Sequence, residues 1–210
     1  MFDLDGTITW HDTLVPYLVH TLRRHKARVL RLWPLPFAAA RFLIDRDRGR
    51  LKSGLIRAVM GGLTRAEVAA LTRGFLDARL ASLVRPNALS RIEQHRAAGD
   101  HLVLLSASTD FYVRDIGRRL GFDDVICTEV VWRDERLDGA LATANRRGTE
   151  KTRCLESLRR EHPGARVAAY GNAGSDLDHL VRADAPLLVN ASAGTRRRAA
   201  RLGVPSGDWR

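Results

Sequence analysis

Short apolar runs alternate with longer helical patterns in the second half of the chain. The runs at 101–105, 166–170 and 184–189 are almost continuously apolar, which is typical of parallel strands buried on both faces. Residues 130–139 contain two short strand patterns around a polar turn, which predicts a small hairpin. The sequence therefore predicts a doubly wound, mostly parallel, Rossmann-like α/β sheet with its ligand site beyond the carboxyl ends of the strands.

The segment 12–85 has helical spacing throughout. Apolar residues recur every three or four positions at 14–22 and again at 68–80, and a Thr-Arg-Ala-Glu capping box precedes the second run. We therefore expect an all-helical cap over residues 12–85, which we call the helical insertion. It is placed after the first strand of a core formed by residues 1–11 and 86–210.

Residues 29–44 form the most apolar stretch of the helical insertion. Arg31, Arg41 and prolines at positions 34 and 36 interrupt it, and it is too short to span a bilayer. One interpretation is a buried pair of helices. The other is an interfacial segment that lies on an anionic membrane, with arginines beside its apolar side chains.

The helical insertion also carries most of the net positive charge of the chain. The 210 residues are 45% hydrophobic, which suits one α/β domain with a large insertion, and the net charge is +11. Residues 12–85 hold 15 Lys and Arg against 5 Asp and Glu, an excess of +10. Such a surface attracts phosphorylated metabolites, acidic lipids or nucleic acid, although a solvated helical surface has the same composition. Because no platform of aromatic and basic residues is evident, we expect no nucleic-acid partner.

Cysteine usage and the N-terminal pattern indicate the compartment. Cys127 and Cys154 form neither a CxxC motif nor a disulfide framework, which favours a reducing environment. The N-terminus lacks a basic segment followed by an apolar run, so no signal peptide is predicted. We expect a cytoplasmic protein, peripheral to the inner face of the membrane if the interfacial interpretation holds.

Residues capable of chemistry lie where the predicted strands end. Asp3 and Asp5 follow an apolar start, and side chains two residues apart point to the same side of a strand. Ser106 ends the next strand, the segment 171–176 follows another, and Lys151 lies near the start of a helix. A nucleophilic carboxylate, a second carboxyl, a hydroxyl, a cation and hard oxygen ligands suit Mg²⁺-assisted phosphoryl transfer.

This set resembles the haloacid dehalogenase (HAD) superfamily, and more narrowly its phosphoserine-phosphatase-like branch with a helical cap. The first motif, DxDGT, is matched by residues 3–7, and the second by the strand that ends at Ser106. The lone lysine of the third motif is matched by Lys151, and the fourth motif by residues 171–176. The resemblance covers essentially the whole chain and implies a HAD-like core and a phosphatase that acts through an aspartyl-phosphate.

The resemblance also implies a role for each residue. Asp3 would attack phosphorus, while Asp5 would protonate the leaving oxygen and then activate water. Ser106 would donate a hydrogen bond to a phosphoryl oxygen, and Lys151 would neutralise negative charge. The ligands of Mg²⁺ would be Asp3, the backbone carbonyl of Asp5, Asn172 and Asp176.

Asn172 departs from the family pattern, which usually has Asp at this position. An amide oxygen can ligate Mg²⁺ without a formal charge, so we expect weaker Mg²⁺ binding than in relatives with Asp. Asp176 is a direct ligand or a neighbour of one in this interpretation. The alternative for Asp176 is a charge partner of a helix N-terminus.

The helical insertion is expected to select the substrate. Asp12 lies where phosphoserine phosphatases place an acidic residue that meets the substrate amino group, although the residues around it differ from those enzymes. Lys52 and Arg57 are candidates to contact a second anionic group, or they lie on solvated helix faces. Ala107 and Ser108 are further candidates for substrate contact.

Within the branch, the chain looks most like a bacterial group of uncertain substrates that includes phosphatidylglycerophosphate phosphatases. An anionic phospholipid would suit the basic and apolar insertion. Phosphoserine or another small metabolite is the main alternative, and a non-catalytic relative that binds anions or a membrane surface is the alternative of another class.

The first strand is unusually short. Only Met1 and Phe2 precede Asp3, whereas a strand is normally about 5–6 residues long. A charged α-amino group would then lie near the sheet interior, where burial is costly. We therefore expect the natural chain to begin several residues earlier.

Overall fold

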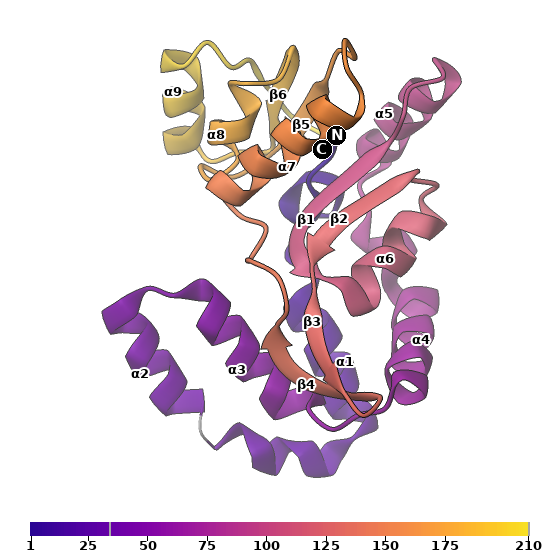
Figure 1. Ribbon diagram of the computed structural model, residues 1–210, viewed down its shortest axis with the longest axis vertical. Coiled ribbons are helices and arrows are strands. Elements are labelled where there is room, and N and C mark those ends of the chain that lie inside the picture. Colours follow the sequence, from indigo (N-terminus) through magenta and orange to yellow (C-terminus); the bar gives the residue numbers. More distant parts are fainter. Residues whose placement is uncertain (34, 210) are drawn as a thin grey trace.

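A parallel sheet with helices on both faces forms one body, and the helical insertion lies beyond one edge of that sheet (Figure 1). The computed structural model describes residues 1–33 and 35–209, so the predicted break at Pro34 lies outside the described residues. The order across the sheet is β2 (Asp124–Thr128), β1 (Val103–Thr109), the N-terminal segment, β5 (Ala168–Gly171), β6 (Ala185–Val189) and β7 (Ser206–Gly207).

The N-terminal segment occupies the centre of this sheet. Phe2 forms parallel bridges with Leu104 in β1 and Tyr170 in β5. The Phe2 amide donates to the carbonyl of Val103 at 2.8 Å, and the Asp3 amide donates to the carbonyl of Tyr170 at 3.0 Å. Asp3 therefore stands at the carboxyl edge of the central strand, and the predicted doubly wound fold is confirmed.

The α-amino group lies at the opposite edge. Met1 is buried, and its amino group donates to the carbonyl of Ala168 at 2.8 Å. Burial lowers the pKa of this amino group to about 5, an effect that Asp100 partly opposes. The group therefore loses most of its charge at neutral pH.

Alternate strand residues form two hydrophobic clusters, one on each face of the sheet. Phe2 and Leu104 belong to one cluster, and Val103 and Leu105 belong to the other. This two-residue alternation explains why the strand sequences are continuously apolar. The helices packed on the first face are α5 (Pro86–Ala97) and α6 (Asp110–Arg119), and those on the second are α7 (Thr149–Glu161), α8 (Leu177–Leu180) and α9 (Ala193–Arg201).

The helical insertion leaves and re-enters the core at one place. The Trp10 amide donates to the carbonyl of Leu83, and the Arg85 amide donates to the carbonyl of Ile8, each at 2.9 Å. The two ends of the insertion therefore lie side by side. Its helices are α1 (Leu14–Arg24), η2 (Lys26–Leu32), α2 (Leu35–Asp45), α3 (Arg48–Met60) and α4 (Arg65–Leu83).

Local signals place two of the predicted features. Thr64 accepts a hydrogen bond from the Glu67 amide, and the Glu67 carboxylate accepts one from the Thr64 amide, which completes the predicted capping box of α4. β3 (Val130–Arg133) and β4 (Arg136–Leu141) form the predicted hairpin. This hairpin packs against α3, where Arg57 pairs with Asp138 of β4 at 2.8 Å, and the Leu137 amide donates to the carbonyl of Leu63 just after α3 at 2.8 Å.

The apolar stretch 29–44 ends η2 and forms α2, at the outer end of the insertion (Figure 1). Leu30 and Ile44 are 79% and 86% exposed, and Val29, Trp33, Phe37 and Leu43 are also exposed. The interpretation of this stretch as a buried helix pair is therefore wrong for the side chains that the structure describes. The reason is that, among the described residues, α2 packs mainly on α3, which leaves these apolar side chains exposed. Within the described ranges, no helix combines the length and apolar character needed to cross a bilayer.

Candidate active site

A cavity of about 450 Å³ lies at the carboxyl edge of the sheet, between the core and the helical insertion. Asp3 ends the central strand, Ser108 lies near the end of β1, and Lys151 is in the first turn of α7. The core residues that line it are Asp3, Asp5, Ala107, Ser108, Asn145, Arg147, Lys151, Asn172, Ala173, Ser175 and Asp176. The residues from the insertion and its start are Asp12, Leu14, Val15, Phe42, Arg48, Leu51, Lys52 and Leu55.

A buried ion-pair network fixes Asp3. Lys151 Nζ donates to Asp3 Oδ1 at 2.5 Å and to Asp176 Oδ1 at 2.8 Å. The Thr7 hydroxyl donates to Asp3 Oδ2 at 2.9 Å. All four side chains are buried. Asp3 is therefore held in one orientation at the cavity, with a cation beside it.

Burial and charge act on this network in opposite directions. Burial raises the pKa of Asp3, and the Lys151 ammonium opposes this shift. Burial disfavours the charged form of Lys151, but Asp3 and Asp176 outweigh it and raise the pKa of this lysine. Burial likewise disfavours ionised Asp176, but Lys151 holds the pKa of Asp176 below its usual range. Lys151 therefore stays protonated and Asp176 stays ionised at neutral pH.

A second network orients Asp5. Asp5 Oδ1 accepts hydrogen bonds from the Thr13 amide and hydroxyl, each at 2.7 Å, and Oδ2 accepts one from the Ser108 hydroxyl at 2.6 Å. The Thr13 hydroxyl also contacts the Tyr112 hydroxyl at 2.9 Å. Burial raises the pKa of Asp5, and the nearby Asp12 carboxylate adds to this shift. A carboxyl group with a raised pKa is suited to hold and transfer a proton.

Gly6 lets the first and fourth motifs approach each other. Gly6 has φ = 81°, a left-handed conformation that favours glycine. A Cβ atom at this position would lie 2.0 Å from Nδ2 of Asn172. The Gly-Thr turn after Asp5 therefore brings Asn172 against the loop that carries the two catalytic candidates.

Backbone amides of the fourth motif, residues 171–176, hold the Asp176 side chain at the site. Asp176 Oδ2 accepts hydrogen bonds from the amides of Asn172 and Ala173 at 3.1 and 2.9 Å. Its other oxygen bonds to Lys151. The loop and the lysine together fix this carboxylate, and Asn172 remains at the cavity wall.

The donor set fits a hard divalent cation. The ammonium of Lys151 lies between the carboxylates of Asp3 and Asp176, and the Asp5 carboxyl group lines the same cavity, so acidic groups outnumber the cation at this end of the cavity. Asn172 adds a neutral amide oxygen. Oxygen ligands with net negative charge are the environment that Mg²⁺ prefers.

Lys52 also lies at the cavity, as do Asp12, Ala107 and Ser108 from the predicted substrate set. Lys52 Nζ donates to the carbonyl of Ala107 at 2.6 Å and to Asn145 Oδ1 at 2.8 Å. Burial lowers the pKa of Lys52 to about 8, although Asp5 and Asp12 oppose this shift. Lys52 is therefore a cation that titrates close to the physiological range.

Two predicted residues lie elsewhere. Arg57 pairs with Asp138 of the hairpin at 2.8 Å and does not line the cavity, because α3 directs it toward β4. Ser106 is fully buried behind the cavity wall, where its hydroxyl accepts a hydrogen bond from the Ser108 amide at 3.0 Å. Ser108, rather than Ser106, presents its hydroxyl to Asp5.

Sequence reasoning missed several residues at the cavity. Thr13 orients Asp5, Asn145 binds Lys52, and Arg48 and Arg147 add positive charge at the wall. Thr13 follows the predicted Asp12, and a hydroxyl at that position was the one available signal. Asn145 carried no signal, because only tertiary structure brings it to Lys52.

Comparison with known proteins identifies the relatives of this chain. The family model of the haloacid dehalogenase-like hydrolases matches residues 1–180. Protein CicA of Caulobacter vibrioides is 36% identical over 186 residues, which cover 87% of this chain and 82% of CicA. Phosphoserine phosphatase SerB1 of Mycobacterium tuberculosis is 25% identical over 230 residues, which cover 98% of this chain and 74% of SerB1.

A solved structure has the same fold over the whole chain. The crystal structure of a protein of unknown function from Bordetella pertussis Tohama I superposes with a TM-score of 0.80 at 23% identity. The match covers 100% of this chain and 97% of that one. The arrangement of core and helical insertion is thus shared with an experimentally determined structure.

Proposed function

Because the chain belongs to the haloacid dehalogenase-like hydrolases, we propose that it is a Mg²⁺-dependent phosphatase that hydrolyses phosphomonoesters through an aspartyl-phosphate on Asp3. One observation carries this proposal. Asp3 ends the central strand at the cavity, and Lys151 holds its carboxylate beside Asp176 while Asp5 lies in a separate hydrogen-bond network. This arrangement separates a nucleophile from an acid and base.

The proposed reaction has two steps. An oxygen of Asp3 attacks phosphorus, the bond between phosphorus and the ester oxygen breaks, and Asp5 gives its proton to the leaving alcohol. Asp5 then takes a proton from water, the water oxygen attacks phosphorus, and inorganic phosphate leaves Asp3 free.

The proposed reaction needs cations, because the Asp3 carboxylate must approach a negatively charged phosphate. A carboxylate and a phosphate 4 Å apart repel by about 4 kcal/mol at an effective dielectric constant near 20. Lys151 supplies one positive charge at Asp3. Asp3, the backbone carbonyl of Asp5, Asn172 and Asp176 would hold Mg²⁺, which supplies further neutralisation of the phosphate when bound.

The test of this proposal uses para-nitrophenyl phosphate and the purified full chain. We expect turnover that requires MgCl₂, and a loss of about 1,000-fold or more in Asp3→Asn, as for removal of a nucleophile. Asp176→Asn, which keeps the shape but removes a charge, should retain more activity than Asp3→Asn. Absence of turnover by the wild-type chain with Mg²⁺ would instead favour a non-catalytic protein that binds anions.

For the substrate, we propose an anionic phospholipid monoester such as phosphatidylglycerophosphate, reached from the cytoplasm at the inner face of a membrane. The exposed apolar side chains at 29–44 support this proposal, as does the +10 excess of the helical insertion. The cavity wall itself combines apolar Phe42 and Leu51 with basic Arg48 and Lys52. An acyl chain and a phosphorylated headgroup would each meet a matching surface there.

A soluble phosphomonoester such as phosphoserine is the second candidate. Asp12 lines the cavity, and a carboxylate there could receive a substrate amino group. SerB1, a relative at 25% identity, is named as a phosphoserine phosphatase. This candidate requires no contact between the exposed side chains of η2 and α2 and a membrane.

A paired assay separates the two candidates. Turnover is measured with phosphatidylglycerophosphate in detergent micelles and with phosphoserine, while flotation with anionic vesicles measures membrane binding. The lipid proposal predicts higher kcat/KM for the lipid, and weaker flotation of the exposed variant Phe37→Asp than of the control Arg201→Asp. Preferred turnover of phosphoserine without lipid turnover would overturn it and leave the general phosphatase proposal intact.

A further inference from the structure

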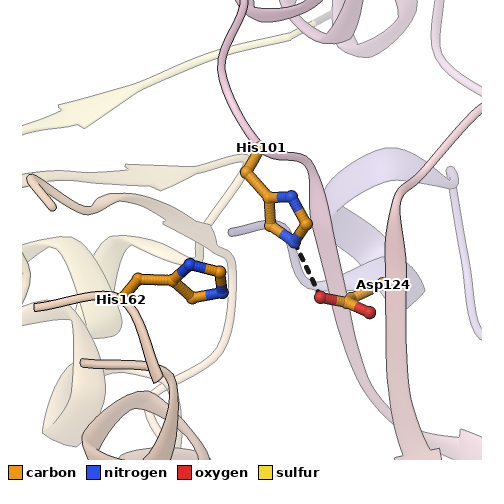
Figure 2. A group of neighbouring side chains, drawn as sticks. All are labelled: His101, Asp124 and His162. Atoms are coloured by element: carbon orange, nitrogen blue, oxygen red, sulfur yellow. Dashed lines mark hydrogen bonds and ion pairs between the residues drawn. The ribbon is translucent and has the colours of Figure 1, made fainter. Parts of the chain in front are cut away.

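Two histidines and a carboxylate gather on the surface at the amino-terminal edge of the sheet. His101 precedes β1, Asp124 begins β2 and His162 follows α7, and Figure 2 shows the three side chains turned toward one another. Each residue offers one ligand atom, and these atoms all lie within 4.8 Å of one another. The catalytic candidates lie at the other ends of the same elements, near the carboxyl end of β1 and the first turn of α7.

We propose that His101, Asp124 and His162 bind a divalent transition-metal ion of the Zn²⁺ type. Two imidazoles, a carboxylate and a water molecule form a four-coordinate set that Zn²⁺ commonly adopts. This chemistry differs from that of the catalytic cavity, where oxygen donors suit Mg²⁺. The two sites would therefore select different ions.

The present geometry is close to that of a bound ion. In a tetrahedral site with bonds of about 2.0–2.1 Å, ligand atoms are about 3.3 Å apart. His101 Nε2 and Asp124 Oδ2 are 2.7 Å apart, and the rings of His101 and His162 have centroids 5.1 Å apart at an angle of 39°. The side chains of His101 and Asp124 are 46% and 49% exposed, so both can rotate. Small rotations would lengthen the contact between His101 and Asp124 and bring His162 closer to both.

Asp123 stands where a partner of a metal-bound histidine is expected. His101 Nδ1 lies 3.8 Å from Asp123 Oδ2, and that oxygen is fixed because it accepts a hydrogen bond from the Leu102 amide at 2.7 Å. A metal on Nε2 of His101 requires the ring proton on Nδ1, which then faces Asp123. This carboxylate–histidine–metal arrangement fixes the tautomer and strengthens the ligand. Asp123 is therefore a positioning residue.

His162 completes the set without breaking another interaction. Within the described ranges, its ring nitrogens have no hydrogen-bond partner, and its ring contact is with His101. Both histidines also line a cavity of about 380 Å³ that opens to solvent beside Met1. An ion can enter from this side, and water can fill the fourth position.

An ion at this site would connect three elements that are distant in sequence. It would link the segment before β1, the start of β2 and the end of α7, which hold the sheet and its covering helix together. Because a ligand that binds only the folded state stabilises it, the ion should raise the thermal midpoint of unfolding, Tm. The inference concerns stability and is independent of the phosphatase proposal.

The experiment titrates the full chain with ZnCl₂ in a calorimeter, with MgCl₂ in excess to occupy the catalytic cavity. We expect one Zn²⁺ per chain, with affinity at least about tenfold weaker in His162→Ala, because even outer partners of metal sites contribute about 10–100-fold. Asp123→Asn should also weaken binding. His25→Ala, which replaces a histidine at the end of α1, is the matched control and should bind as the wild type does.

Thermal unfolding gives an independent measurement. Zn²⁺ should raise the Tm of the wild type and of His25→Ala, and it should leave the Tm of His162→Ala unchanged. His162 is exposed, so this variant is expected to fold. Equal Zn²⁺ affinity of wild type and His162→Ala, or no binding by the wild type, would overturn the proposal.

Discussion

At the scale of single residues, Asn172 is the neutral member of the proposed Mg²⁺ ligand set. Its amide packs against Gly6, and it lines the same cavity as Asp3 and Asp176, but it brings no charge. We expect Asn172→Asp to lower the Mg²⁺ concentration for half-maximal activity by about tenfold, equivalent to about 1.4 kcal/mol. Asn172→Ala should raise it. Titration of activity against MgCl₂ measures both, and an unchanged midpoint in Asn172→Asp would remove Asn172 from the ligand set.

Lys52 gives the site a pH dependence of its own. Burial lowers the pKa of this lysine to about 8, so the ammonium is present below that pH and is lost as pH rises through it. A phosphomonoester should therefore bind less well above about pH 8, and kcat/KM should fall there while the acidic limb is unaffected. Lys52→Arg keeps its charge at high pH, so this variant should lose the alkaline decline. An identical profile in both proteins would exclude Lys52 as the titrating group.

At the scale of elements, the capping box of α4 connects local sequence to the stability of the insertion. The Thr64 hydroxyl accepts from the Glu67 amide at 3.2 Å, and its loss in Thr64→Ala should cost about 1 kcal/mol of unfolding free energy. Ser82→Ala in the same helix is the control, because its exposed hydroxyl bonds back to the helix and caps nothing. Urea unfolding compares the two variants, and equal midpoints would show that the cap contributes nothing.

Elements with strong local signals were predictable from sequence, and those that depend on partners were not. The runs that became β1, β5 and β6 are apolar because both faces of the sheet are covered. β2 was missed, since it is half-buried with a charged start, and β7 was missed because two residues carry no pattern. The packing of the hairpin on α3 also escaped prediction, because no local pattern records which neighbour covers a strand.

In the candidate site, too, residues with a local sequence signal were predictable and contacts between distant segments were not. Asp3, Asp5, Lys151 and Asp176 were identified because their chemistry and motif spacing are local properties, and the structure brings them to one cavity. Contacts between distant segments, such as that of Asn145 with Lys52, form only in the folded chain. Long flexible side chains were the least predictable, because several neighbours compete for them.

At the scale of the whole molecule, the predicted HAD-superfamily phosphatase is confirmed in family and fold, and the distribution of charge becomes its most distinctive property. The insertion, with its excess of +10, forms one wall of the candidate active-site cavity. Charge on that side should attract an anionic substrate before it binds. Charge on core helices that do not line the cavity should have less influence, because screening weakens the effect of a charge with its distance from the cavity.

Two double variants with the same change in net charge test this difference. Arg23 and Arg24 end α1 in the insertion, whereas Arg197 and Arg201 are exposed on α9. We expect Arg23→Glu with Arg24→Glu to lower kcat/KM for para-nitrophenyl phosphate at about 0.01 M salt by several-fold more than Arg197→Glu with Arg201→Glu. The difference should vanish at about 1 M salt, where the screening length is about 3 Å, and kcat should stay constant. Equal losses in the two variants would mean that net charge, and not its position in the insertion, governs substrate capture.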